Sequence, residues 1–530
     1  MLKKFKFAMK GKTSIQGQKY TKYKNTIPRD QNSILLMFLA CFISILILFK
    51  PLQRSKKTLH LPPSPSKLPI IGNFHQLGTL PHRSFHALSQ KYGPLMLLHL
   101  GHLPVLVISS ADLAKEVMLT HDAIFASRHN SVAAKILFYG CKNVAFSPLG
   151  QMWRQKKKLL VSHILTQKRV ESVQFIREEE VEAMVNKIYS KAWMSNGSCV
   201  NLREILVENI HNIICRCAFG SKNNDEDGNH RFEETVGKLM AQVTDFSVGD
   251  LFPLLGWIDV LSGKLEKFKS TFREMDAFFD DVISKRKMER KDSEKKDFLD
   301  ILLQLQEDGE LEIELTLDDI KGLLADMFLG GSDTNSTTLE WAMAELIKNP
   351  ITMKKAQEEV RKVVGNKPKL DENDVNEMSY LKCVVKETLR LHPAAPFLAP
   401  RETTSSIKLR GYDIPYKTMV NINVWAIQRD PEFWEKPEEF IPERFENYNF
   451  NSKGRDFQFI PFGYGRRKCP GITFGLVSAE YVLANLLYSF DWKLSRSGEI
   501  VHDLDMSEAY GLTVKKKEPL FLVPMPYSVV

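Results

Sequence analysis

The chain has 530 residues, of which 43% are hydrophobic and 26% are charged. This length and composition exclude a disordered chain, a collagen and a miniprotein held together by disulfides. The formal net charge is +9, but the first 60 residues carry 13 basic side chains and one acidic one, so the rest of the chain carries −3. A nucleic-acid-binding domain needs a basic footprint in its folded part, so nucleic acid is not expected as a partner.

An uncharged apolar segment at 33–49 follows a basic extension at 1–32. As a helix, the segment would span about 26 Å, close to the thickness of the hydrocarbon core of a bilayer. No small-residue cleavage site follows it, and charged, proline-rich sequence comes next, so it is predicted to be a single-pass transmembrane anchor rather than a signal peptide or a buried core helix. Residues 50–69 are basic and proline-rich and predict a hinge, either a stiff polyproline segment or an ordinary linker.

The basic extension has three interpretations that the sequence leaves open. Nine basic residues precede the anchor and four follow it closely, which by the positive-inside rule places the N-terminus in the cytosol and the large domain across the membrane. The extension is also basic and poor in acid, as plastid transit peptides are, although it is rich in lysine rather than arginine. The third interpretation is a start assigned too far upstream.

Residues 70–530 predict one large, mostly α domain with a minor β region. Two short β-like runs, Leu95–Leu100 and Val105–Ile108, are separated by a turn that contains glycine. Apolar residues at helical spacing predict helices at Ile176–Trp193, Leu261–Lys287 and Leu317–Lys348, and helical sequence returns at Gly471–Tyr488.

One of the seven cysteines has distinctive surroundings. The seven are odd in number and include no Cys-x-x-Cys pair, which argues against a disulfide framework and against structural zinc. Cys469 lies in a glycine-rich loop, FQFIPFGYGRRKCPGITFGL, directly after Arg466, Arg467 and Lys468 and before a predicted helix. Positive charge and a helix N-terminus stabilise a thiolate. Such a thiolate suits a nucleophile or a metal ligand, but no nearby motif supplies the histidine base that a nucleophile needs.

The predicted helix Leu317–Lys348 contains the poor helix formers LGGSDTNSTT in its middle. We expect the glycines to let a flat cofactor approach the bare backbone, with freed carbonyls and the Thr334 hydroxyl holding water. The alternative is a kinked core helix in which Asp333 is a solvated carboxylate.

The run Phe462-x-x-Gly465-x-Arg467-x-Cys469-x-Gly471 resembles in full the haem-binding signature of the cytochrome P-450 superfamily. The helix sequence GGSDTN is similar to the oxygen-activation motif of that superfamily, with Asn335 where Thr or Ser is usual. The segments FASR, WAIQRDP, CPGITFGL and EAYGLTV resemble the plant A-type clan, above all its largest family, family seventy-one. The resemblance covers about residues 61–530.

The resemblance implies the mostly α haem-thiolate fold, with haem b as cofactor and Cys469 as the axial thiolate ligand of its iron. It implies that Asp333 and Thr334 relay protons during oxygen activation and that Phe462 and Gly463 lie at the cofactor.

Trp153, Lys157, Arg401 and Arg467 match positions that contact the haem propionates in the family. Lys157 stands where arginine is usual, so a point charge replaces a bidentate contact.

Two other features of the sequence concern charge outside the cofactor site. The Glu387-x-x-Arg390 pair and the later Arg444 are interpreted as a structural network of charge-assisted hydrogen bonds, without a catalytic role. Lys156 and Lys158 are interpreted as an exposed basic face that could receive an acidic electron-donor protein.

The resemblance implies a monooxygenase that inserts one oxygen atom from O2 into a lipophilic plant specialised metabolite, such as a terpenoid, alkaloid, phenylpropanoid or coumarin. Electrons would come from NADPH through NADPH–cytochrome P-450 reductase, with cytochrome b5 as a further partner. The substrate would lie among Leu324–Gly331, Ala394–Ala399 and Ala509–Leu512. The expected location is the endoplasmic reticulum membrane, with the catalytic domain in the cytosol.

Two other functions are kept as alternatives. The first is a redox-neutral haem-thiolate enzyme such as an aldoxime dehydratase, against which the hydroxyl of Thr334 argues. The second is a haem sensor or electron carrier, which needs neither an acid–alcohol pair nor a large apolar pocket.

Overall fold

The structure is a computed structural model that describes residues 59–194, 199–220, 226–288, 296–309, 311–367, 369–446, 457–494 and 504–527. From His60 onward the chain forms one compact unit. The predicted extension at 1–32, the anchor at 33–49 and residues 50–58 of the predicted hinge lie outside the described residues. The described hinge residues, 59–69, lie against the sheet region, where the amide of Leu97 donates to the carbonyl of Pro63 at 3.0 Å.

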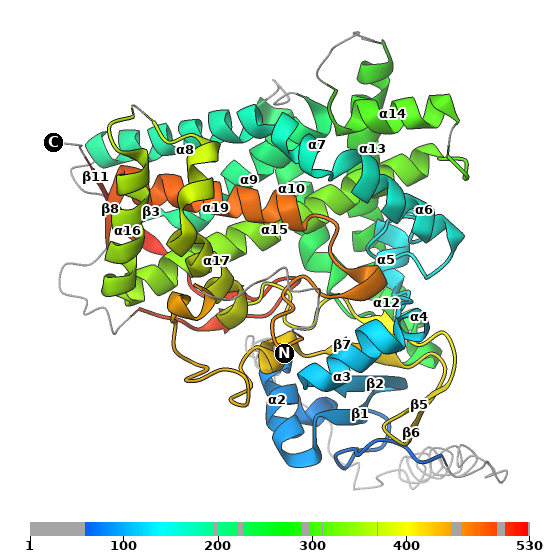
Figure 1. The fold of residues 1–530 in the computed structure, drawn as a ribbon. Coiled ribbons are helices and arrows are strands. Elements are labelled where there is room, and N and C mark those ends of the chain that lie inside the picture. Colours follow the sequence, from blue (N-terminus) through cyan, green and yellow to red (C-terminus); the bar gives the residue numbers. More distant parts are fainter. Residues whose placement is uncertain are drawn as a thin grey trace, which may run out of the picture. The chain divides into compact units, whose positions relative to one another are not determined.

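Helices make up most of the described chain (Figure 1). Their bounds are α2 Pro81–Tyr92, α3 Ala111–Lys115, α4 Asp122–Phe125, α5 Val132–Leu137, α6 Gln151–Leu159, α7 Gln167–Ser172, α8 Gln174–Met194, α9 Leu202–Phe219, α10 Glu226–Val243, α11 Val248–Leu251, α12 Trp257–Leu261, α13 Lys264–Met288, α14 Phe298–Asp308, α15 Leu317–Lys348, α16 Pro350–Val364, α17 Ser379–Leu391, α18 Val424–Ile427 and α19 Ile472–Ser489.

The strands form small sheets beside the helices. Their bounds are β1 Leu95–Leu100, β2 Leu103–Ile108, β3 Val200–Asn201, β4 Arg401–Glu402, β5 Ile407–Leu409, β6 Tyr412–Ile414, β7 Met419–Ile422, β8 Phe490–Leu494, β9 Glu508–Ala509, β10 Lys515–Lys516 and β11 Phe521–Pro526. The largest sheet has the order β1-β2-β7-β4, with β2 parallel to β7 and the other pairs antiparallel. The predicted β-like runs are therefore the first hairpin of this sheet.

Helix α15 is the long helix that the sequence predicts, with the same ends. It begins at a capping box, in which Thr316 and Asp319 bond each other's amides, and Pro350 follows its last residues. At 32 residues it is about 48 Å long. The helix continues without a break through the glycine-rich stretch, where hydroxyls such as that of Thr338 donate to carbonyls four residues back. The expected freed carbonyls are therefore not found there, because side-chain hydroxyls bond them.

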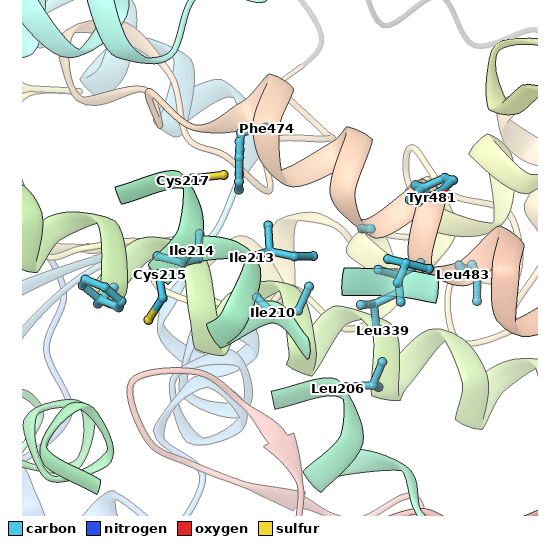
Figure 2. Close-up of a cluster of buried hydrophobic side chains, with 14 of the residues drawn as sticks. Leu206, Ile210, Ile213, Ile214, Cys215, Cys217, Leu339, Phe474, Tyr481 and Leu483 are labelled. Atoms are coloured by element: carbon cyan, nitrogen blue, oxygen red, sulfur yellow. The ribbon is translucent and has the colours of Figure 1, made fainter. Parts of the chain in front are cut away.

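The main apolar core joins α9, α15 and α19. Side chains of α9 from Leu206 to Cys217 lie in the same cluster as Leu339 of α15 and Phe474 of α19 (Figure 2). Residues such as Leu206, Ile210 and Ile213 recur at helical spacing, so one face of α9 is buried throughout. This packing fixes α15 at the centre of the helical region.

Within the described residues, α19 is the one helix long and apolar enough to cross a membrane. Of its apolar window, 61% is buried inside the protein, and it packs against α15, α16 and α17. It is therefore a core helix of the domain.

The predicted structural network around Glu387 is present. Glu387 and Arg390 are both fully buried in α17 and form two hydrogen bonds of 2.7 and 2.8 Å, and Arg444 lies 3.3 Å from the same carboxylate. Arg390 also donates to the carbonyls of Gln428 and Pro437. The network thus connects α17 to the loops that precede the Cys469 loop.

Candidate active site

A cavity of ≈ 360 Å³ lies between α6, α15, residues 394–401 and the Cys469 loop. Its walls are mostly apolar, and two of the predicted pocket segments, 324–331 and 394–399, contribute to it. The third, Ala509–Leu512, is not among its lining residues. Two hydrogen bonds of the residues that follow explain this. Thr513 donates to Asp333 of α15, and the amide of Val514 donates to the carbonyl of Ala394. Together these bonds hold the β9–β10 hairpin against another face of α15.

Cys469 reaches the cavity from a loop that is tightened by glycines. Gly463 and Gly465 have φ values of +67° and +73°, and a Cβ on Gly465 would lie 2.3 Å from the carbonyl oxygen of Met118. The amide of Cys469 donates to the carbonyl of Phe462 at 3.0 Å, which closes the loop. Phe462, Gly463 and Cys469 all line the cavity.

The thiol of Cys469 is exposed to the cavity but deep within the protein. Burial raises its pKa, and the amide of Gly471 and the charges of Lys157 and Lys468 partly oppose this. Arg466, which the sequence places beside the thiol, pairs instead with a carboxylate of α4 at 3.2 Å. A thiolate is therefore favoured here once a metal cation binds the sulfur.

Arg128, Arg401 and Arg467 meet at the edge of the cavity. Arg401 pairs with Asp122 of α4 at 2.9 Å, whereas Arg128 and Arg467 donate to main-chain carbonyls. Burial lowers the pKa of all three arginines, to about 9 for Arg467, and mutual repulsion adds to this at Arg128 and Arg467. An anionic group in the cavity would relieve this excess of positive charge.

Trp153 and Lys157 of α6 also line the cavity. Trp153 is 3% exposed, and its Nε1 has no hydrogen-bond partner among the described residues. The guanidinium of Arg467 lies 4.2 Å from the centre of the indole ring. Lys157 donates to the carbonyl of Lys468, and burial lowers the pKa of Lys157 to about 8.

The exposed basic face expected beside Lys157 is only partly present. Lys158 is exposed, but the prediction for Lys156 is wrong, because that side chain is buried. Lys156 forms an ion pair with Asp319 in the first turn of α15 and donates to the carbonyl of Lys142. A buried acceptor on a neighbouring helix thus accounts for the difference.

Thr334 and Asp333 occupy different faces of α15. Thr334 lines the cavity, and its hydroxyl donates to the carbonyl of Gly330 at 2.7 Å. Asp333 is not among the lining residues; its carboxylate accepts a hydrogen bond from Thr513 at 2.5 Å. Thr513 in turn lies 3.3 Å from the hydroxyl of Thr337.

The comparisons with known proteins agree with this arrangement. The family model described as cytochrome P-450 matches residues 62–523. The chain belongs to the cytochrome P-450 family. It is 52% identical to a phenylacetaldehyde oxime monooxygenase of Prunus mume, over 94% of this chain and 95% of the relative, and 44% identical to strychnine-11-hydroxylase of Strychnos nux-vomica, over 93% and 98%. Among solved structures, a zebrafish cytochrome P-450 with progesterone is similar at a TM-score of 0.73 and 25% identity, covering 84% of this chain and all of that one.

The P-450 fold and the resemblance to the plant family seventy-one are thus confirmed, and the protein is a P-450 monooxygenase. The family implies a haem cofactor, and the cavity residues fit one. Cys469 offers a thiol on a closed loop, Gly330 and Gly331 offer bare backbone on α15, and the arginines with the unpaired Trp153 Nε1 suit an anionic edge.

Three residues at or beside this site are not among those predicted from the sequence. Arg128 lies in FASR, which resembles the clan, but its contact with the cavity depends on the 394–401 segment far along the chain. Asp326 lies in α15 and lines the cavity, and burial raises its pKa to about 7. Thr513 lies in EAYGLTV, and only the folded hairpin brings it to Asp333.

Proposed function

We propose that this P-450 monooxygenase inserts one oxygen atom from O2 into a lipophilic plant specialised metabolite, with electrons from NADPH delivered by a flavoprotein reductase. The observation that carries the proposal is that Cys469 and Thr334 line the same cavity, whose other walls are mostly apolar. Haem, when bound through Cys469, supplies the iron at which O2 is activated.

The residues at the cavity edge have a binding role in this proposal. Arg128, Arg401 and Arg467 hold the propionates of haem b, and Nε1 of Trp153, which has no partner in the described part of the chain, donates a further hydrogen bond. Lys157 adds a point charge at the same edge, and Phe462 and Gly463 lie against the cofactor.

Proton delivery is assigned to α15. The hydroxyl of Thr334 holds a proton at the cavity, and its bond to the carbonyl of Gly330 orients it. Thr513 holds Asp333 on the neighbouring face of the helix. In this proposal Asp333 therefore passes protons along the surface of α15, from outside the cavity. The apolar walls exclude water from the rest of the cavity.

The names of the relatives guide the choice of substrate. They include an oxime monooxygenase and an alkaloid hydroxylase, both of plants. An aromatic aldoxime has an apolar ring and a short polar end, which suits an apolar cavity with a few polar groups. Phenylacetaldehyde oxime is therefore the first probe, with terpenoids, alkaloids, phenylpropanoids and coumarins as the broader class.

The proposed test uses the full chain in membranes with a plant reductase, phenylacetaldehyde oxime, NADPH and ¹⁸O2. We expect a product that contains one ¹⁸O atom and that requires both NADPH and the reductase, as measured by mass spectrometry. Conversion of the oxime to phenylacetonitrile without NADPH and O2 would establish the redox-neutral alternative instead. If the oxime is not converted, a panel from the broader class under the same conditions tests the substrate range.

The reductase is proposed to bind the exposed basic residues near the Cys469 loop, with cytochrome b5 as a second partner. Arg154, Lys158, Arg466 and Lys468 are exposed there and suit an acidic surface. The proposed location is the endoplasmic reticulum membrane, through the apolar segment at 33–49.

A further inference from the structure

The segment between α5 and α6 lies along the first turns of α15. Lys142 pairs with Asp318 at 2.7 Å, and its carbonyl accepts a hydrogen bond from the buried Lys156. One turn farther along α15, a Cβ on Gly322 would lie 3.2 Å from the amide nitrogen of Asn143. The bare backbone at Gly322 therefore lets the segment approach the helix closely.

Asp326, one turn beyond Gly322, holds this segment by its carboxylate. It accepts hydrogen bonds from the side-chain amide of Asn143 at 2.7 Å, from the amide of Val144 at 2.5 Å and from the amide of Ala145 at 3.3 Å. The carboxylate is partly buried at the cavity wall, so these donors replace water that it loses on folding. Asp326 thereby fixes the orientation of successive peptide groups.

The carbonyls of the same segment face the arginines of the cavity edge. Arg467 donates to the carbonyls of Val144 at 3.0 Å and Ser147 at 2.5 Å, and Arg128 donates to the carbonyl of Ala145 at 2.9 Å. The peptide groups on either side of Val144 and Ala145 are therefore held from two directions. The Asp326 charge also favours the charged form of Arg467.

We infer that Asp326 is a positioning residue for the cofactor: through residues 143–145 it aims Arg128 and Arg467 at the anionic edge of the haem. The inference rests on the proposed role of the cavity as the haem site. It assigns a function to a carboxylate that lies outside the sequence motifs of haem binding and proton delivery. Loss of Asp326 should speed the release of haem while leaving the Cys469 ligand in place.

The test compares Asp326→Ala and Asp326→Asn with the wild type as full-length holoproteins. Transfer of haem to excess apomyoglobin, followed in the Soret band, should become about tenfold faster or more in Asp326→Ala, and less so in Asp326→Asn. Before transfer, the reduced carbon monoxide complex should keep its thiolate-type spectrum. Hydrogen–deuterium exchange should show faster exchange in a peptide that covers residues 142–147.

Asp318→Asn is the matched control, because Asp318 holds the same segment through an exposed ion pair. Its rate of haem transfer should stay close to that of the wild type. A wild-type rate in both Asp326 variants, or an equal acceleration in Asp318→Asn, would overturn the inference. If Asp326→Ala does not accumulate, a double-mutant cycle of Asp326→Asn and Arg128→Lys decides. The effects of the two substitutions on the rate of haem transfer should be coupled if Asp326 acts through Arg128, and additive effects contradict the inference.

Failure of the inference is distinguishable from failure of the proposed function. If Cys469→Ser keeps a thiolate-type spectrum, the cavity is not the haem site and the proposed function fails. If the spectrum depends on Cys469 while the Asp326 variants release haem at the wild-type rate, only the role of Asp326 is wrong.

Discussion

The surroundings of Cys469 differ from those of the other described cysteines. Cys141, Cys215, Cys217 and Cys383 are buried, and burial raises the pKa of each thiol. Cys469 alone among the described cysteines lines the cavity. Burial makes these four thiols inert, and the exposed Cys199 does not line the cavity, whereas Cys469 is accessible to a cofactor from the cavity side.

Replacing Cys469 with Ser should abolish the thiolate-type spectrum of the reduced carbon monoxide complex, because an alcohol is a far weaker anionic ligand than a thiol. Cys383→Ser, in a buried site of α17, should keep that spectrum. Difference spectra of the expressed proteins measure both. A thiolate-type spectrum in Cys469→Ser would refute the ligand assignment.

Thr334→Ala should uncouple NADPH consumption from product formation, because the hydroxyl at the cavity is lost. The NADPH consumed per product should rise about tenfold or more, while Thr334→Ser should stay close to the wild type. The measurement follows NADPH, hydrogen peroxide and product in the reconstituted system. Unchanged coupling in Thr334→Ala would remove this residue from proton delivery.

The sequence predicts individual residues well where a motif is local. The Cys469 loop is recognisable because its glycines, arginine and cysteine occupy one short stretch of chain. Arg128 and Thr513 are not recognisable as site residues in this way, because their partners lie about 270 and 180 positions away. A single sequence carries no signal for such contacts before the chain is folded.

Helices of this protein are predictable to the extent that their ends carry caps. Both ends of α15 are predicted, since Thr316 caps its start and Asn349-Pro350 ends it. The single helix predicted at Leu261–Lys287 is instead the end of α12 and most of α13. Gly263 separates them with φ +73°, a backbone conformation that a helix does not allow.

The contact between α19 and α17 contains a carboxyl group with an unusual titration. Glu480 of α19 faces Lys382 and Lys386 of α17, and burial raises the pKa of Glu480 to about 7 although both lysines oppose this. The folded protein therefore keeps a proton that the unfolded chain releases above its ordinary pKa of 4.5. The contribution of this group to the free energy of unfolding therefore falls as the pH rises from 4.5 to about 7.

Glu480→Gln should therefore gain stability relative to the wild type as the pH rises from about 5 to about 8, because the amide stays neutral. The thermal midpoints of the two holoproteins across this range provide the measurement. Glu358→Gln, at an exposed position of α16, should show no such trend. A difference between Glu480→Gln and wild type that does not vary with pH would contradict the raised pKa.

At the scale of the whole molecule, the Glu387 network joins parts that are distant in sequence. Arg390 donates to carbonyls of the 428–439 region, and the side chain of Gln428 accepts from the amide of Ile460 at the start of the Cys469 loop. The amide of Ile441 also donates to Glu387 at 2.9 Å. The position of the Cys469 loop thus depends on a charge pair that does not line the cavity.

Glu387→Gln should destabilise the protein by about 3–5 kcal/mol, because Arg390 would keep a buried charge without its partner. Denaturant unfolding of the holoprotein measures the loss, and the fraction of expressed chain that binds haem should fall with it. Glu439→Gln, which alters an exposed side chain of the same region, is the control and should change little. Equal stability of the two variants would show that the network is dispensable.

The two neighbouring glycines of α15 differ in what they permit. A Cβ on Gly331 would lie 2.6 Å from Ile214 of α9, whereas a Cβ on Gly330 meets no atom within 4 Å. Both residues line the cavity. A methyl group at position 330 would therefore meet no protein atom, whereas one at position 331 would displace the end of the Ile214 side chain and so disturb the packing of two core helices.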